Sequence, residues 1–402
     1  MLSLLGVGYP LIEFLFTGRG AFGDLVDGLI LTPIYYHPDL GQDLTFSQPN
    51  SPTTVLLYTI FRFFAPSLAA TNWLTVNWNS IFLLLTSFLL IIAFLVRKIS
   101  DTRLTSILLV FSYPMLFLFG RANPDIYCLI FFIMFIMSFE KEKYVLCALL
   151  IAIIGAIKLP FFFLSLVFIF VKKIKVFVSS VVLLPIFFYS PLLLFGYPFF
   201  SQITSISNVA KNYHRDYVLG EAGSMFNNSL FGLLKIINYI FMQKKDLTAG
   251  DLLIVNERLV ELHNFLVILT LLAFAIFVMK LEVLKSNEKL DRNQLLRVIL
   301  ILISLSILLP YVSAEYRLSL LVPPIAVLIR RKEFDTVSAV LVGFLFLPKS
   351  LYVIGFENEF MGTHFLSSVV NPVILIVLIV HQARLVWISK PKAIRQVKKG
   401  IN

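Results

Sequence analysis

Two carboxylates stand three residues apart in the segment FGDLVDG, just after the first apolar run of the chain. Asp24 and Asp27 are of a residue type that can act as a general base toward a hydroxyl group. Basic and amide side chains able to bind an anion occur in three distant segments: GRANPD (120–125), IKLP (157–160) and SAEYR (313–317). Together these residues could line one water-filled cavity, provided that the intervening elements bring them to one place.

The intervening elements are apolar. The chain has 402 residues, of which 58% are hydrophobic and 14% charged, and apolar runs recur from end to end. A soluble domain buries one face of each helix and does not repeat unbroken apolar runs in this way. The sequence therefore predicts an all-α polytopic membrane protein, and its first residues lack the basic region and cleavage site of a signal peptide.

About twelve transmembrane helices are predicted, since roughly 20 apolar residues cross a bilayer and fewer suffice inside a bundle. The predicted spans are 2–16, 77–96, 105–119, 125–139, 144–158, 160–171, 176–195, 262–280, 297–310, 317–330, 336–348 and 369–386. Several are short, notably 160–171, so one or two of them could be re-entrant or merged.

The basic residues predict an orientation. In this register 22 of the 34 Lys and Arg residues fall in short segments on one side, which the positive-inside rule makes cytoplasmic. Both termini are then cytoplasmic, and the bacterial plasma (inner) membrane is the expected location. The net charge of +11 is explained by these loops without nucleic acid. Cys128 and Cys147 lie in apolar segments and predict neither a disulfide nor a metal site.

The polar residues of the other side lie mainly in two long loops. We interpret the chain as one domain, 1–402, with outer loops at 17–76 and 196–261 and a basic cytoplasmic tail at 387–402. Within the loops, SPTTVLLYTIFRFF and LFGLLKIINYIF are typical of short amphipathic helices at the membrane interface.

The order of the motifs resembles the GT-C glycosyltransferases, and most closely glycosyltransferase family 87, the polyprenol-phosphate-mannose-dependent mannosyltransferases. The segments that carry the resemblance are Asp24-Leu25-Val26-Asp27, Gly120-Arg121-Ala122-Asn123, Lys158-Leu159-Pro160, Asn227-Asn228-Ser229-Leu230-Phe231-Gly232, and Pro310 to Arg317. Three departures stand out: Asp27 replaces the usual Tyr, Arg121 replaces the usual Gln, and SAEYR lacks the Trp and His of the family pattern.

The resemblance implies a GT-C-like bundle that transfers a hexose, mannose first, from a polyprenyl-phosphate donor to a glycolipid or cell-envelope glycan. Transfer with inversion needs one carboxylate base, because the phosphate leaves without an acid, unlike the leaving oxygen in glycoside hydrolysis. Cations and amides should surround the leaving phosphate. The implied roles are catalysis by Asp24, with Asp27 second, and donor-phosphate binding by Lys158, Arg317, Arg121 and Asn123. The candidate substrate-binding residues are Tyr36, His37, Asn228, Glu315 and Tyr316.

Each of these residues also has a structural interpretation. Asp24 and Asp27 could cap helices or be solvated loop acids, and Lys158 could extend along the membrane to reach water. Arg317 could pair with Glu315 or another acid. No cofactor or metal is expected. The expected partners are the lipid-linked donor, the acceptor and the bilayer, without nucleic acid, and a monomer is predicted.

Two other classes of function stay open. A transporter or flippase for a lipid-linked saccharide predicts repeat symmetry and polar groups at the bilayer midplane, whereas the polar groups here gather on one side. A non-catalytic assembly protein predicts that replacing Asp24 has no consequence while the fold survives.

Overall fold

The computed structural model describes residues 51–63, 73–121, 123–195, 198–220, 227–242, 249–281, 290–349 and 366–388. These residues form helices, and the one strand-like feature among them is an isolated bridge between Asn227 and Ala314. The elements are α3 (Pro52–Phe63), α4 (Trp73–Ile99), α5 (Arg103–Val110), α6 (Tyr113–Arg121), α7 (Asp125–Glu140), α8 (Tyr144–Ile157), η2 (Leu159–Leu166), α9 (Val167–Phe170), α10 (Ile174–Tyr189), η3 (Ser190–Leu194), α11 (Phe199–Tyr213), η4 (His214–Val218), α12 (Leu230–Met242), α13 (Ala249–Lys280), α14 (Arg292–Leu308), η7 (Glu315–Leu321), α15 (Val322–Arg330), α16 (Thr336–Phe346) and α17 (Ser367–Ile388). The predicted all-α class is confirmed for this part of the chain.

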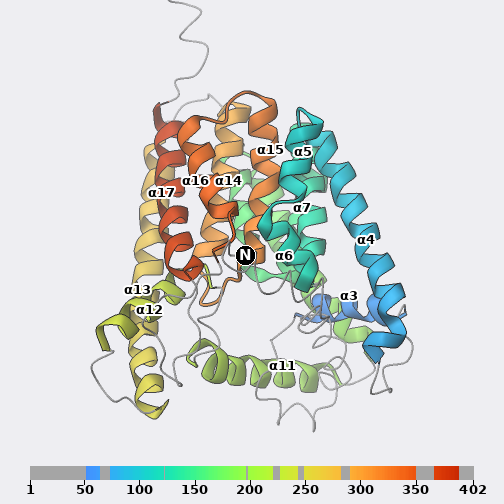
Figure 1. Cartoon of the computed structure of the whole chain (residues 1–402), viewed down its shortest axis with the longest axis vertical. Coiled ribbons are helices and arrows are strands. Elements are labelled where there is room, and N and C mark those ends of the chain that lie inside the picture. Colours follow the sequence, from blue (N-terminus) through green and yellow to red (C-terminus); the bar gives the residue numbers. More distant parts are fainter. Residues whose placement is uncertain are drawn as a thin grey trace, which may run out of the picture.

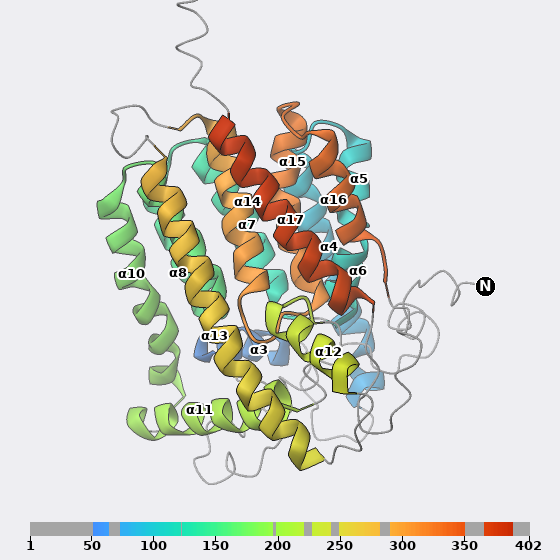
Figure 2. The same ribbon diagram turned by 90° about the vertical axis from the view of Figure 1, so that its left-hand side faces the viewer.

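Most of the helices stand upright beside one another, and α11 lies across one end of them in both views (Figures 1 and 2). We call the end that carries α11 the lower end and the opposite one the upper end. Helices α3 and α12 also lie toward the lower end. Helix α14 is surrounded by its neighbours and is buried from Gln294 to Leu308, which is why its sequence lacks a polar face.

Several helices are long and apolar enough to cross a membrane. Within the described ranges there are three, Ile174–Leu194, Ile254–Lys280 and Ser367–Ile388, or up to four if α5 and α6, bent by 49° at their junction, form one span. Helix α13 leaves apolar side chains uncovered, with Phe265 62% and Leu272 56% exposed. These features agree with a membrane protein, whereas the count of about twelve spans stays a prediction.

Three helical hairpins turn through residues with positive φ that are not glycine: Glu142, Lys172 and Lys332. Each turn closes with a backbone hydrogen bond across five residues, as in the Schellman motif. The bonds run from Lys143 to Ser138 at 3.0 Å, from Lys173 to Phe168 at 2.8 Å and from Glu333 to Leu328 at 3.0 Å. These tight turns account for the short basic connections that the sequence contains.

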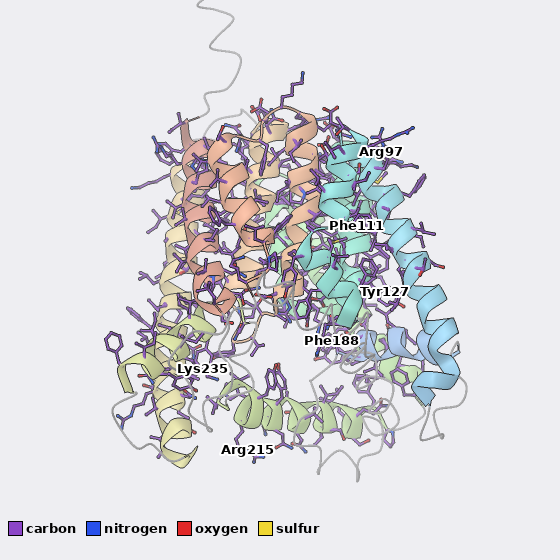
Figure 3. All side chains as sticks on the ribbon, in the orientation of Figure 1. Arg97, Phe111, Tyr127, Phe188, Arg215 and Lys235 are labelled. Carbon is purple, nitrogen blue, oxygen red and sulfur yellow. The ribbon has the colours of Figure 1, made fainter. Side chains whose placement is uncertain are left out.

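The basic turns gather at the upper end. Arg330 and Arg331 both contact Glu140, at 3.2 and 2.7 Å, and Arg292 contacts Glu142 at 2.8 Å. Figure 3 shows Arg97 at this end and Arg215 at the opposite one. Segments that the charge pattern assigns to one side therefore do share one end of the bundle.

The second predicted outer loop needs a correction. Residues 196–261 were predicted to be a loop with one amphipathic helix, but α13 begins at Ala249 and runs unbroken to Lys280. The polar residues before 262 are compatible with a helix, and only their low hydrophobicity excluded them from the predicted span. The predicted amphipathic segments at 51–64 and 230–241 are helices, α3 and α12.

Candidate functional site

The start of α3 is fixed to the lower ends of α8 and α10 by hydroxyl groups. Ser51 Oγ and Thr54 Oγ1 donate to the carbonyl oxygen of Ile157, at 3.2 and 3.0 Å. Thr53 Oγ1 donates to the carbonyl oxygen of Phe187 at 2.7 Å. Because Ile157 is the last residue of α8, the first two bonds satisfy a carbonyl that a helix end leaves open. The chain that emerges from the first predicted outer loop is thus held at the end of α8.

Asn123 joins the start of α7 to the SAEYR segment. Its Oδ1 accepts a hydrogen bond from the backbone N–H of Asp125 at 2.9 Å, and its Nδ2 donates to the Tyr316 hydroxyl at 2.9 Å. The first N–H groups of a helix have no partner within the helix, so the first bond stabilises the start of α7. Asn123 is only 1% exposed. Its amide therefore holds two distant segments together, whatever else it binds.

Arg317 and Asp125 form a buried ion pair at the same place. Arg317 Nε lies 3.5 Å from Asp125 Oδ2, and the two side chains are 12% and 0% exposed. Arg317 Nη1 also donates to the carbonyl oxygen of Val312 at 2.8 Å, and Cζ lies 6.0 Å from the centre of the Phe161 ring. Neither carboxylate oxygen of Asp125 accepts a hydrogen bond from a described residue. Among these residues, Arg317 is the group that compensates the buried charge.

Lys158 lies close to this pair and forms no ion pair with any residue that the structure describes. Helix α8 ends at Ile157, and Lys158 takes an extended conformation with φ −140° and ψ 99°. Its side chain is half-buried. Lys158, Arg317 and Asp125 all act electrostatically on the Cys128 thiol, so the three charges occupy one region. We call Lys158, Arg317 and Asp125 the charged cluster.

Hydrogen bonds join the segment 227–229 to the residues that precede η7. The Asn227 Oδ1 accepts from the backbone N–H of Ser313 at 2.8 Å and from that of Ser229 at 3.0 Å. The Asn227 Nδ2 and the Ser229 hydroxyl both donate to the carbonyl oxygen of Tyr311, at 3.1 and 2.8 Å. The next residue, Asn228, donates its backbone N–H to the carbonyl oxygen of Ser313 at 2.6 Å. The first and third residues of this motif are therefore structural.

Glu315 points away from the charged cluster, toward the start of α17. Its carboxyl group is 1% exposed. Burial raises the pKa of Glu315 above its usual value, although Ser367, Lys349 and Tyr113 act in the opposite direction. Burial also lowers the pKa of Lys349 to about 8, an effect that Glu315 opposes. Lys349 Nζ donates to the carbonyl oxygen of Leu347 at 2.9 Å, so this lysine is held at the end of α16.

The structure brings together four of the predicted phosphate- and substrate-binding residues: Lys158, Arg317, Asn123 and Tyr316. Asn228 is bonded through its backbone to Ser313, and Glu315 lies beside Ser367, Lys349 and Tyr113 rather than in the charged cluster. Arg121 ends α6 two residues before Asn123 and is half-buried. Asp24, Asp27, Tyr36 and His37 lie outside the described residues.

Sequence reasoning missed Asp125 as a partner of Arg317. The sequence offers Glu315 or another acid as the structural partner of Arg317, and the order of the motifs does not single out Asp125. The signal was the position of Asp125 directly after Asn-Pro, at the first residue of an apolar helix, where a carboxylate cannot reach water freely.

The described residues contain no group of three His, Cys, Asp or Glu side chains that could hold a metal ion. The chemistry available in the charged cluster is binding of an anion by Lys158, supported by an arginine already oriented by Asp125. A half-buried cation in such a place binds an anion more strongly than a cation in bulk water does, because the local dielectric constant is lower.

Comparisons with protein-family models, with characterised proteins and with solved structures gave no match to this chain. Fold and site together define an all-α protein, with helices able to cross a membrane and a buried charged cluster at one end of its helical bundle.

Proposed function

We propose that the chain is an integral-membrane glycosyltransferase of the GT-C type, resembling glycosyltransferase family 87. It transfers a hexose, with mannose as the first candidate, from a polyprenyl-phosphate donor to a glycolipid or envelope glycan. The proposal includes about twelve spans, cytoplasmic termini, a bacterial plasma membrane and a lower end that faces away from the cytoplasm.

One observation carries this proposal. Three segments that are remote in sequence and rich in anion-binding residues meet at the lower end. The bond between Asn123 and Tyr316 joins the first segment to the third, and the ion pair between Asp125 and Arg317 does so again. Lys158 adds the second segment and a cation without an ion pair among the described residues.

The distribution of charge between the two ends of the bundle also supports the proposed function. At the upper end, Arg330 and Arg331 share the single carboxylate of Glu140. At the lower end, Lys158 has a positive charge that no described acid pairs with. The headgroup of a lipid phosphate lies at the level where helices leave the membrane, so a cation at a helix end can reach it.

The proposed reaction is a single displacement at the anomeric carbon. The acceptor hydroxyl oxygen forms a bond to this carbon while its proton passes to the Asp24 carboxylate. The bond from the carbon to the phosphate oxygen breaks, and its electron pair leaves with the polyprenyl phosphate. Negative charge grows on the phosphate, and Lys158 stabilises it, with Arg317 nearby. Segment 51–54 is docked at the end of α8, at the same end of the bundle, and the proposal assigns the Asp24 carboxylate to this end as well.

A binding measurement tests the donor site. Purified protein in detergent is titrated with a short-chain polyprenyl-phosphate mannose, and Lys158→Met is compared with the wild type. A charge-assisted contact contributes about 1.5–3 kcal/mol, so binding should weaken roughly 10- to 100-fold. Lys175→Met is the matched control, because Lys175 is exposed in the first turn of α10, which begins right after a basic hairpin turn. Equal losses in both variants, or none in Lys158→Met, would contradict the proposed phosphate site.

A further inference from the structure

Four lysines lie on two neighbouring turns at the upper end. Lys141 and Lys143 belong to the turn between α7 and α8, Lys173 belongs to the turn between α9 and α10, and Lys175 lies in the first turn of α10. All four side chains are exposed, whereas Lys158 is half-buried. We call these four lysines the lysine patch.

Two observations show that the turns are neighbours. Helices α8 and α10 pack against each other, and both begin at the upper end (Figure 2). Lys173 Nζ lies 5.5 Å from the centre of the ring of Tyr144, which is the first residue of α8. The lysines of the two turns therefore share one surface.

The nearby acids are already paired with arginines. Glu142 lies between the two lysines of the first turn but contacts Arg292 at 2.8 Å. Glu140, at the end of α7, contacts Arg330 and Arg331 at 3.2 and 2.7 Å. No lysine of the patch forms an ion pair with any residue that the structure describes. The patch therefore has a positive charge that these residues do not compensate.

The starts of α8 and α10 add to this positive charge. The N-terminal end of a helix has a partial positive charge, so acids are favoured in its first turn and cations are not. Neither first turn contains an acid, and the N-cap residues are Lys143 and Lys173, which have no acceptor for the open backbone N–H groups. An anion at the patch would relieve the repulsion among these charges.

Apolar side chains beside the lysines indicate the kind of anion. Val145 is 82% exposed, Ile174 is 54% exposed, and Val178, one turn further along α10, is 52% exposed. Ile174 is also the first residue of a segment long and apolar enough to cross a membrane. A phospholipid has both a phosphate for the lysines and acyl chains for the apolar side chains, whereas a soluble anion would leave the apolar side chains uncovered.

We propose that the lysine patch binds the headgroup of an anionic phospholipid whose acyl chains lie along the exposed face of α10. The phosphate lies among ammonium groups from both turns, and the chains cover Val145, Ile174 and Val178. This inference goes beyond the proposed function, because it concerns the opposite end of the bundle and does not involve the sugar donor. The bound lipid would fix the depth at which α8 and α10 begin in the bilayer.

The test compares two phospholipids with the same acyl chains. Phosphatidylglycerol has one net negative charge, and phosphatidylcholine has none. Each lipid is titrated into the full-length protein in a nonionic detergent, and the lipid that stays bound is counted by native mass spectrometry. Each lysine close to an anionic headgroup contributes a factor of about 5, so the wild type should bind phosphatidylglycerol at least about 30-fold more tightly than phosphatidylcholine.

A double variant, Lys143→Gln with Lys173→Gln, removes one charge from each turn. It should bind phosphatidylglycerol about 10- to 30-fold more weakly and phosphatidylcholine as the wild type does. The matched control is Lys98→Gln with Arg103→Gln, which removes two exposed charges beside the turn between α4 and α5, at the same end. The control should lose less than about 3-fold. Because all four side chains are exposed, both double variants should unfold at the wild-type temperature.

Three results would overturn the proposal. Equal binding of the two lipids by the wild type would show that the patch does not recognise negative charge. Equal losses in the two double variants would mean that the whole basic end, rather than this patch, attracts the lipid. Displacement of phosphatidylglycerol by excess inorganic phosphate would mean that the patch binds a free anion. None of these results bears on the proposed function, which is tested at the lower end.

Discussion

Removal of one partner of the buried ion pair should destabilise the protein strongly, and removal of both should not. Arg317→Gln leaves Asp125 fully buried, with no hydrogen-bond donor among the described residues. Asp125→Asn leaves a guanidinium group that is still 12% exposed and still bonded to the carbonyl oxygen of Val312. The arginine variant should therefore be the less stable of the two.

The magnitude follows from the geometry. Two unit charges 3.5 Å apart attract each other by about 5 kcal/mol at an effective dielectric constant of about 20. Part of this attraction offsets the cost of removing both charges from water, so the pair itself adds little. Breaking a buried pair costs about 3–5 kcal/mol because one charge stays uncompensated. We expect Arg317→Gln to lower the free energy of unfolding by about 3–5 kcal/mol and Asp125→Asn to lower it by about half as much. The double variant should lose less than Arg317→Gln alone.

The assay is unfolding in mild detergent with increasing denaturant, followed by the fluorescence of the three tryptophans. Arg292→Gln serves as the control, since Arg292 and Glu142 form a pair of 2.8 Å whose side chains are 50% and 60% exposed. Such an exposed pair contributes about 0–1 kcal/mol. Losses in the two cluster variants that simply add up, or a loss in Arg317→Gln no larger than in Arg292→Gln, would refute this account of Asp125.

Three further predictions concern stability. Because burial raises the pKa of Glu315 above its ordinary value of about 4.5, the free energy of unfolding that this group contributes is complete below that pH and is lost as the pH rises. Glu315→Gln should therefore melt above the wild type at about pH 8, with a difference that shrinks toward acid pH; a difference that grows in acid would contradict the sign. Thr54→Val should cost about 1 kcal/mol in the same unfolding assay, because it removes one of the two hydroxyl bonds to the carbonyl oxygen of Ile157 at the end of α8. An unchanged midpoint would show that this hydroxyl does not hold α3 there. A Cβ at Gly232 would lie 2.8 Å from the side-chain amide of Asn227, so Gly232→Ala should cost about 1–3 kcal/mol of stability. A Cβ at Gly343 meets nothing within 4 Å, so Gly343→Ala should stabilise α16 by up to about 1 kcal/mol. A stabilised Gly232→Ala beside a destabilised Gly343→Ala would contradict this packing.

The helices could be predicted from the sequence because apolar runs and their charged boundaries are local signals. The predicted span 77–96 lies within α4, and 125–139 corresponds to α7 almost residue for residue. The bend in the predicted span 105–119 also had a local cause that was overlooked, since Ser112 and Pro114 stand at the junction of α5 and α6. The length of α13 was underestimated, because the predicted span was defined by hydrophobicity alone and began at 262 instead of at Ala249.

The pairing of side chains could not be predicted in the same way. Asp125 and Arg317 are far apart in sequence, and any of several acids could have met that arginine. The bond from Asn371 Nδ2 to Asn228 Oδ1 was missed for the same reason, because its two partners come from distant segments. The order of the motifs predicted which segments come together. Only the fold shows which side chains bond to one another.

The most direct measurement of the central claim is hexose transfer. Purified wild-type protein is incubated with polyprenyl-phosphate mannose carrying a labelled sugar and with lipid and glycan extracts of a bacterial envelope, beside a well-folded Asp24→Asn variant. The account predicts that the wild type moves the label to an acceptor and that the variant does so about 100-fold more slowly or worse, since a general base contributes at least that factor. Transfer at equal rates by the two proteins, or no transfer by the wild type from any polyprenyl-phosphate hexose, would contradict it.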